Sequence, residues 1–400
     1  MLRDELVELL SPGGLTLLDS LPPYDSERDI VKLVASLRSA GHPPALVAAV
    51  LTQAKLRAKA GGAQGKFGDF AERMLFTEAG LEQATRLRVA ARHAARFRDA
   101  GIRHVADLGC GIGGDAMAIA ALGLRVTAVD RDEVTAAIAS YNLAPFPDTV
   151  VEQGDAEGFD ITRTEALWLD PARRTAGHSD TRRLTDSDDW SPSIDWVFNA
   201  ASRMPVGVKL GPGFDRDLIP GSAEAQWVSV GGHVVEVALW FGALARPGIT
   251  RAALVLDDDG AHELTAPADS PDEAVGELGA YLYEPDGAVI RARLIGDLAR
   301  SLDARMIGDG IAYLTADEPH RTPFAQGFRI VERLPYPEKE LRAALRERGI
   351  GVLEIKKRGV DVDPARLRGR LALMGPNSAT LILTRAAGRH TALLAERLTP

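Results

Sequence analysis

The chain has 400 residues, of which 46% are hydrophobic and 26% charged, and its formal net charge is −9. This length exceeds one ordinary domain, and the composition is that of a globular chain with a sizeable core. No apolar run approaches the length of a membrane span, and the acidic start is unlike a signal peptide, so we expect a cytoplasmic protein that contacts no membrane. The single cysteine, Cys110, excludes an internal disulfide and a cysteine-based zinc cluster, and the histidines lack metal-ligand spacing, so no metal is expected.

Positive charge is concentrated in two stretches of this acidic chain. Residues 55–98 contain ten Lys and Arg against four Asp and Glu, and residues 329–370 contain twelve against seven. Local basic faces can bind phosphate even on an acidic protein. The alternative is that these arginine-rich segments are only solvated surfaces, and the sequence leaves both interpretations open.

The first hundred residues are predicted to be helical. Apolar residues after Ser26, the predicted N-cap, follow the spacing of one helix face, and a second helix is expected from Pro44 to the glycines at 61–62. A further helix from Thr85 to Phe97 leads into the first strand. The turn before it is in position to cover a ligand, so Gln83 and Thr85 are candidate cofactor contacts, unless they only cap the helix.

The segment from His104 to Asp130 predicts a strand, a glycine-rich turn, a helix and a second strand that ends in an acid. Glycines let the backbone approach a ligand closely, and the N-terminus of a helix directs its free N–H groups toward that ligand. An acid about twenty residues after the turn, here Asp130, is suited to hydrogen-bond ribose hydroxyls. The segment therefore predicts a site for a nucleoside cofactor.

Two cofactors fit the glycines of this turn, which are Gly109, Gly111, Gly113 and Gly114. The first, second and fourth satisfy the dinucleotide pattern G-x-G-x-x-G, and the first three satisfy G-x-G-x-G. Asp107 favours S-adenosylmethionine (SAM), whose amino-acid end is cationic, because a carboxylate would repel a dinucleotide pyrophosphate; a nicotinamide oxidoreductase is the alternative. The segment resembles motif I of class I SAM-dependent methyltransferases, which implies SAM as cofactor, and we also assign Asp115 to cofactor binding.

Strands and helices alternate after this turn. Besides the two strands around it, strands are predicted at 149–153, 166–169, 206–210, 227–230 and 251–256, and helices at 133–142, 193–203 and 234–244. This alternation favours a parallel sheet, and the seven strands match the class I methyltransferases. Ligands bind at the carboxyl ends of such strands. There the resemblance assigns Asp155 to the adenine amino group of the cofactor.

The fourth strand ends in Asp170-Pro171-Ala172-Arg173. Class I enzymes that methylate exocyclic amines carry an acid or amide here, followed by two prolines and an aromatic residue. The resemblance implies that Asp170 and the Pro171 carbonyl hold the amine, although the second proline and the aromatic residue are absent. Arg173 is a candidate to clamp a phosphate or carboxylate of the substrate. Its alternative, shared with Arg174, is a salt bridge to the acids at 186–189.

Other side chains bear on the same chemistry. Trp168 or Trp190 are candidates to stack the base in place of the missing aromatic residue, and Lys209, at the end of the fifth strand, is a further phosphate candidate. Because Cys110 lies inside the glycine turn, methylation of pyrimidine C5 through a cysteine nucleophile is excluded.

The last hundred residues change in character. After a polar segment at 262–279, strands and helices return in an α+β pattern. The sequences EPDGAVIRA, GIGVLEIKKRG, DPARLRGRL and ATLILTR resemble the THUMP-like domain of a family of bacterial methyltransferases related to the trimethylguanosine-synthase-like RNA methyltransferases. This resemblance implies RNA as substrate and partner.

Together these patterns predict an α/β protein with a Rossmann-like seven-stranded sheet of the class I methyltransferase type. We expect a helical N-terminal region at 1–98, a catalytic domain at 99–258 and a smaller α+β THUMP-like domain at 275–400. The expected activity is SAM-dependent methylation of a base nitrogen of RNA. The alternatives are a small-molecule or protein methyltransferase, and an RNA-binding protein that retains SAM binding without catalysis. The sequence contains no signal for the oligomeric state.

Overall fold

The computed structural model of the chain describes residues 3–22, 27–62, 65–173 and 190–398, without the side chains of 27–31 and 172–173. It divides into two compact units: residues 1–210 with 239–245, and residues 211–238 with 246–400. Among the described residues, no helix combines the length and the apolar character needed to cross a membrane.

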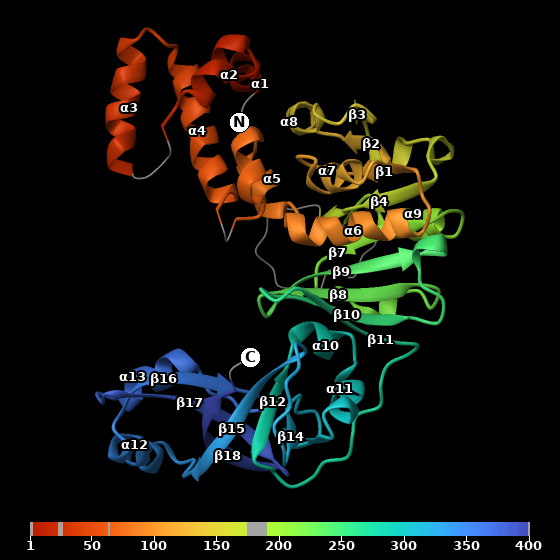
Figure 1. The fold of residues 1–400 in the computed structure, drawn as a ribbon. Coiled ribbons are helices and arrows are strands. Elements are labelled where there is room, and N and C mark those ends of the chain that lie inside the picture. Colours follow the sequence, from red (N-terminus) through yellow and green to blue (C-terminus); the bar gives the residue numbers. More distant parts are fainter. Residues whose placement is uncertain (1–2, 23–26, 63–64, 174–189, 399–400) are drawn as a thin grey trace. The chain divides into compact units, whose positions relative to one another are not determined.

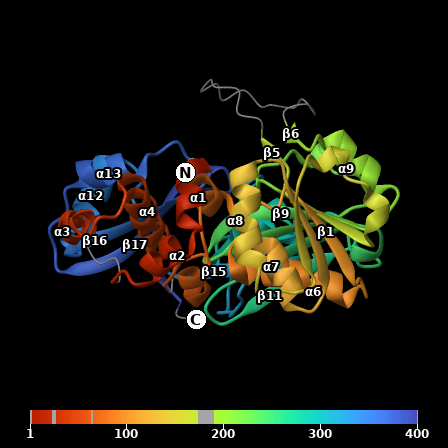
Figure 2. The same cartoon turned by 90° about the horizontal axis from the view of Figure 1, so that it is seen from above.

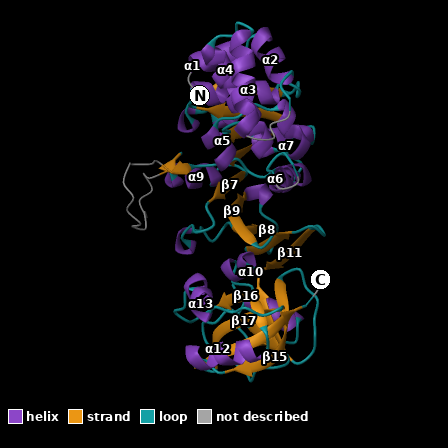
Figure 3. Ribbon diagram, turned by 90° about the vertical axis from the view of Figure 1, so that its left-hand side faces the viewer, coloured by secondary structure: helices purple, strands orange, loops and turns teal. Residues whose placement is uncertain are grey.

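The first unit begins with a group of helices (Figure 3). They are α1 (Arg3–Leu9), α2 (Pro12–Asp19), α3 (Glu27–Ser39), α4 (Pro44–Ala60) and α5 (Glu78–Gln83), with a 3-10 segment at Gly68–Arg73. The helices predicted after Ser26 and from Pro44 are confirmed, whereas Ser26 itself lies outside the described residues. The buried Gln53 side chain exchanges two hydrogen bonds with the backbone of Phe76, which ties α4 to the segment that leads to the glycine turn.

The large sheet contains all seven predicted strands (Figure 1). Its order is β11-β10-β8-β9-β7-β4-β1-β2-β3. These strands are β1 (His104–Leu108), β2 (Arg125–Asp130), β3 (Thr149–Gln153), β4 (Ala166–Leu169), β7 (Val206–Leu210), β8 (Glu224–Val230), β9 (His233–Phe241), β10 (Arg251–Leu256) and β11 (Ala261–Ala266). The helices are α6 (Leu87–Asp99), α7 (Gly114–Ala121), α8 (Glu133–Leu143) and α9 (Ile194–Ala201). Strands β1 to β4 and β7 pair in parallel, which confirms the α/β fold.

Two segments differ from their predictions. Residues 234–244 were predicted as a helix, but most of them form strand β9. Gly231 and Gly232 both have positive φ, which is the backbone of a tight two-residue hairpin turn, and the β-branched and aromatic residues that follow suit a strand. The start of the predicted linker forms β11, which pairs antiparallel with β10.

The C-terminal sheet belongs to the second unit and has the order β13-β14-β12-β15-β18-β17-β16. Its strands are β12 (Tyr281–Pro285), β13 (Arg305–Met306), β14 (Leu314–Ala316), β15 (Ala325–Leu334), β16 (Ile350–Lys357), β17 (Asn377–Ala386) and β18 (Arg389–Arg397). The helices are α10 (Gly287–Arg291), α11 (Ile295–Ser301), α12 (Glu338–Glu347) and α13 (Pro364–Leu371). The predicted α+β character is confirmed, and β18 is a strand that the sequence analysis did not identify.

Candidate active site

The glycine turn has the backbone that its sequence predicts. Gly109, Gly111 and Gly113 have φ of +89°, +55° and +86°, in the left-handed region that favours glycine. The backbone N–H groups of Gly109 and Cys110 donate to the carbonyl of Val129 at 2.8 and 3.0 Å, so the turn is fixed against β2. Helix α7 starts directly after it and packs beside α8 (Figure 2).

Of the two acids expected to bind the nucleoside, one is the last residue of β2 and the other follows β3. Asp130 accepts hydrogen bonds from the backbone N–H groups of Gly111 and Asp132, each at 3.0 Å, and burial raises its pKa. Asp155 is exposed, and its carboxylate caps a short turn by accepting from the N–H of Glu157. Both acids lie at the carboxyl edge of the parallel strands, as predicted.

Asp107 is the buried acid of β1, with 1% of its surface exposed. Burial raises its pKa well above the ordinary range, and the neighbouring carboxylates of Asp115 and Asp170 raise it further. Its Oδ2 atom has no hydrogen-bond partner among the described residues. A buried carboxylate oxygen without a donor is costly, so this atom is suited to receive a donor from a ligand.

Asp115 lies in the first turn of α7 and is also buried. The Thr85 hydroxyl donates to its Oδ2 at 2.7 Å, and the His93 Nδ1 lies 2.9 Å from its Oδ1. Burial alone would raise the pKa of Asp115, but the contacts with His93 and Thr85 and the charge of Lys209 outweigh it and lower the pKa to about 2. The predicted cofactor residues Thr85 and Asp115 therefore contact one another behind the glycine turn.

Asp170, directly after β4, lies next to Lys209 of β7. Strand pairing places Leu169 opposite Val208, so the two following side chains meet at the carboxyl edge, and Lys209 Nζ lies 2.5 Å from Asp170 Oδ2. Lys209 also donates to Thr85 Oγ1 at 3.0 Å. The predicted phosphate candidate Lys209 thus pairs with the candidate catalytic acid.

Segment 66–85 packs against the glycine turn, and it contains a partly buried lysine, Lys66, that the sequence analysis did not identify. The Lys66 ammonium donates to the carbonyls of Glu82 and Ala84, and burial, with the charges of Lys209 and Arg86, lowers its pKa to about 8. Gly80 of α5 has no room for a side chain, because a Cβ there would lie 2.5 Å from Ile112. Short-range patterns carry no signal for such contacts between distant segments.

Some predicted residues do not join this cluster. Gln83 is exposed at the end of α5, and the side chain of Arg173 lies outside the described residues, as do Arg174 and the acids at 186–189. The backbone of Arg173 forms β5 (Ala172–Arg173), which pairs with β6 (Trp190–Ser191), and Figure 2 shows the two strands side by side. Pro171 is buried directly before them.

Trp168 was a candidate to stack a base, and this prediction is wrong. Its ring is fully buried and stacks on Trp240, with centroids 5.4 Å apart, and the tilted ring of His93 lies 4.3 Å away. Gly207 makes room for this stack, because a Cβ there would lie within 3 Å of both tryptophans. Trp168 is therefore a core residue, and it has no face available to a substrate.

The residues present fit SAM. The open backbone of the glycine turn leaves room for a close approach, the Oδ2 of Asp107 lacks a donor that a cationic amino group would supply, and Asp130 follows the neighbouring strand. In the described part of the chain, no group of three His, Cys, Asp or Glu side chains is arranged to hold a metal ion.

Comparison with known proteins gives the family. Two S-adenosylmethionine-dependent methyltransferases of Mycobacterium tuberculosis, from strains CDC 1551 and H37Rv and each described as uncharacterized, are 34% identical to this chain over 335 residues, which is 81% of this chain and 89% of each relative. The family model "THUMP domain-like" matches residues 325–397, and a domain of unknown function matches residues 3–60. The crystal structure of a methyltransferase candidate from Porphyromonas gingivalis W83 covers 94% of this chain and 100% of that chain, with a TM-score of 0.71 and 20% identity, so it shares the fold.

Proposed function

The chain belongs to the S-adenosylmethionine-dependent methyltransferases, and from this premise we propose that it methylates a base nitrogen of RNA. Asp170 is the observation that carries the proposal. The Asp170 side chain is 34% exposed at the carboxyl edge of the sheet. The backbone carbonyl oxygen of Asp170 lies 3.4 Å from the position that a Cβ on Gly109 would take, so the residue adjoins the glycine turn. A carboxylate next to the cofactor turn is suited to hold an amine against the methyl donor.

The chemistry asks little acid–base power of the protein, because SAM itself supplies a methyl group on a good leaving group. Asp170 accepts a hydrogen bond from the amine N–H, which directs the nitrogen lone pair, and it takes the proton as the nitrogen is methylated. The Pro171 carbonyl is the second acceptor, and Arg173 binds a phosphate of the RNA. The Lys209 ammonium lies 2.5 Å from Asp170 Oδ2, so this ion pair holds the acceptor at the edge of the sheet.

The cofactor roles belong to the same proposal. Asp107 receives the amino group of SAM, Asp130 the ribose hydroxyls and Asp155 the adenine amine. Gly109, Gly111 and Gly113 let the backbone approach the cofactor closely. Thr85 and Asp115, which contact one another next to this turn, support the cofactor site, and Gln83 contacts the cofactor from the end of α5. We propose that residues 1–98 form a helical region, residues 99–258 the catalytic domain and residues 275–400 a THUMP-like domain. We also propose that the protein acts in the cytoplasm.

RNA is favoured as the acceptor by the match to the THUMP-like family model at 325–397. The test compares modified nucleosides in each RNA class from cells with and without the gene, by mass spectrometry. We expect one N-methylated base to disappear without the gene, and to return with the wild-type chain or with Lys59→Met, an exposed surface change, but not with Asp170→Ala. An unchanged nucleoside profile in every RNA class would overturn the RNA proposal and leave a small-molecule or protein acceptor.

A further inference from the structure

Lys209 of β7 is unusually buried for a lysine. It is largely buried, with 11% of its side chain exposed, although it carries a full charge. Its ammonium contacts Asp170 Oδ2 at 2.5 Å and donates to Thr85 Oγ1 at 3.0 Å. A buried ammonium is costly unless it is paired, so these contacts hold it in one place.

The contacts of Lys209 continue behind the glycine turn. Thr85 receives a hydrogen bond from Lys209 and donates its own to Asp115 Oδ2, while Asp115 Oδ1 lies 2.9 Å from His93 Nδ1. A continuous polar chain therefore runs from Asp170, beside the turn, to the first turn of α7. This chain joins β7, α6 and α7, three elements that frame the cofactor turn.

Three carboxylates share the neighbourhood of this ammonium. Lys209 is in direct contact with Asp170, it is linked to Asp115 through Thr85, and its charge acts on Asp107. The other charges that act most strongly on Asp107 among the described residues are those of three acids, Asp115, Asp170 and Asp130. Like charges this close oppose one another, so a shared cation matters to all three.

We propose that Lys209 is a positioning residue for the cofactor: it is the shared counter-ion of Asp107, Asp115 and Asp170, and it keeps Asp107 able to receive the amino group of SAM. The inference concerns the cofactor alone, so it stands or falls independently of the methyl acceptor. Without Lys209, three neighbouring acids would lack this cation, and Asp107 would retain its proton instead of accepting a hydrogen bond from the ammonium of the ligand.

The proposal predicts a particular pH dependence of SAM binding. Burial and the adjacent acids raise the pKa of Asp107, so below that pKa the carboxyl is protonated and cannot pair with an ammonium. Affinity therefore rises with pH as Asp107 ionises. Since Lys209 lowers the pKa of Asp107, removing its charge displaces this rise to higher pH. The titrations are made below the pKa of about 7.7–8.0 of an α-amino group, where the amino group of SAM stays charged.

Calorimetric titration of the full chain with SAM tests the proposal. We expect Lys209→Met to bind at least tenfold more weakly at pH 6.5, with its pH profile displaced upward, and Lys209→Arg to bind within threefold of wild type. Lys209→Gln, which retains a donor for Thr85 without the charge, should behave like the methionine variant and carries the test if that variant does not fold. Lys59→Met removes an exposed lysine that pairs with Glu82, and it should bind like wild type.

Asp170→Asn tests whether Lys209 acts through its charge or only by fixing the position of the Asp170 side chain. This variant removes one carboxylate but leaves Lys209 to serve Asp107 and Asp115, so SAM affinity should stay within threefold of wild type. The proposal is overturned if folded Lys209→Met and Lys209→Gln bind SAM within threefold of wild type with an undisplaced pH profile, or if Asp170→Asn loses as much affinity as they do. None of these titrations contains RNA, so a wrong methyl acceptor cannot mimic either outcome.

Discussion

Asp115 is a buried carboxylate whose charge is stabilised by neighbouring side chains. Substituting it therefore shows how much these contacts contribute to the stability of the protein. The pKa of Asp115 is about 2 because His93, Thr85 and Lys209 outweigh the effect of burial. A carboxyl group whose pKa is lower in the folded state stabilises the protein above its unfolded pKa, here near 4, and loses that contribution as the pH falls to about 2. A difference of this size corresponds to about 2 kcal/mol.

Asp115→Asn should therefore lower the free energy of unfolding by about 2 kcal/mol at pH 7, measured by urea titration followed through tryptophan fluorescence. The deficit relative to wild type should shrink as the pH falls from 4 toward 2. Asp258→Asn, which changes an exposed carboxylate, is the control and should have no effect. A deficit that stays constant over this pH range would mean that the charge of Asp115 does not contribute.

At the scale of residues, the positions in the fold that were predicted correctly are those fixed by local sequence. The positions of the turn glycines, of the acids in β1 and β2 and of the acid after β4 follow from spacing alone, because a turn and a strand end are local features. His93, Lys66 and the partner of Lys209 depend on packing between α6, β7 and the segment before α5. No periodicity in one element announces a contact with another, so these residues became visible only in the fold.

Elements show the same division between local and tertiary signals. The parallel strands were predicted because apolar runs alternate with amphipathic helices. Strand β9 was not predicted. Its last six residues are buried, and its continuous apolar run at 237–241 fits a buried helix as well as a strand. The glycine pair at 231–232 was the local signal that could have decided it, since both residues have positive φ.

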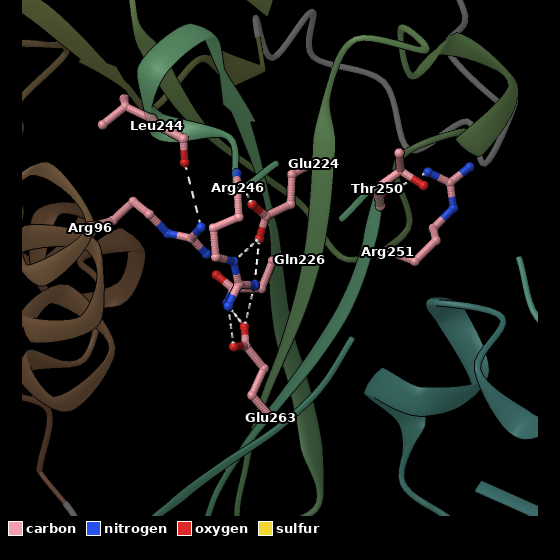
Figure 4. Close-up of polar contacts among 8 residues, drawn as sticks. All are labelled: Arg96, Glu224, Gln226, Leu244, Arg246, Thr250, Arg251 and Glu263. Carbon is pink, nitrogen blue, oxygen red and sulfur yellow. Dashed lines mark hydrogen bonds and ion pairs between the residues drawn. The ribbon is translucent and has the colours of Figure 1, made fainter. Parts of the chain in front are cut away.

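The edge formed by β8, β10 and β11 holds a buried acid that supports another prediction (Figure 4). Glu224 is fully buried and accepts from Arg246 through the backbone N–H at 2.8 Å and the guanidinium at 2.6 Å. Arg246 also contacts Glu263, and both acids raise its pKa against the effect of burial. Arg251, which Figure 4 also shows, pairs instead with the half-exposed Asp269.

Arg246→Met removes the guanidinium that the buried Glu224 contacts, so we expect a loss of about 3–5 kcal/mol of stability in chemical unfolding. Arg251→Met is the matched control, because its partner remains in contact with water, and it should cost about 1 kcal/mol or less. Adding Glu224→Gln to Arg246→Met should recover part of the loss. Equal effects of the two arginine substitutions would contradict the assignment of the cost to the buried acid.

The whole molecule is acidic, so RNA binding depends on where positive charge is available. Within residues 329–370, five cations already pair with acids: Arg329 with Glu396, Arg348 with Glu332, Lys356 with Glu284, Arg366 with Asp363, and Arg370 with Glu338. The count of basic residues in the sequence therefore overstates the charge that a phosphate would meet. RNA binding by this domain would therefore depend on the exposed cations that remain.

Neutralising those remaining cations tests the balance. For exposed Arg333, Lys339 and Lys357, the described residues show no salt bridge. If RNA binds here, their triple substitution by Gln should weaken binding of single-stranded RNA several-fold. It should also make the slope of log affinity against log salt shallower by roughly 0.7 for each phosphate that the protein no longer neutralises. The same substitution at the paired Arg329, Arg366 and Arg370 removes the same net charge, but it should weaken binding less, because these guanidiniums already have acidic partners. Equal effects of the two triple variants, or an affinity independent of salt, would leave the small acceptor as the better explanation.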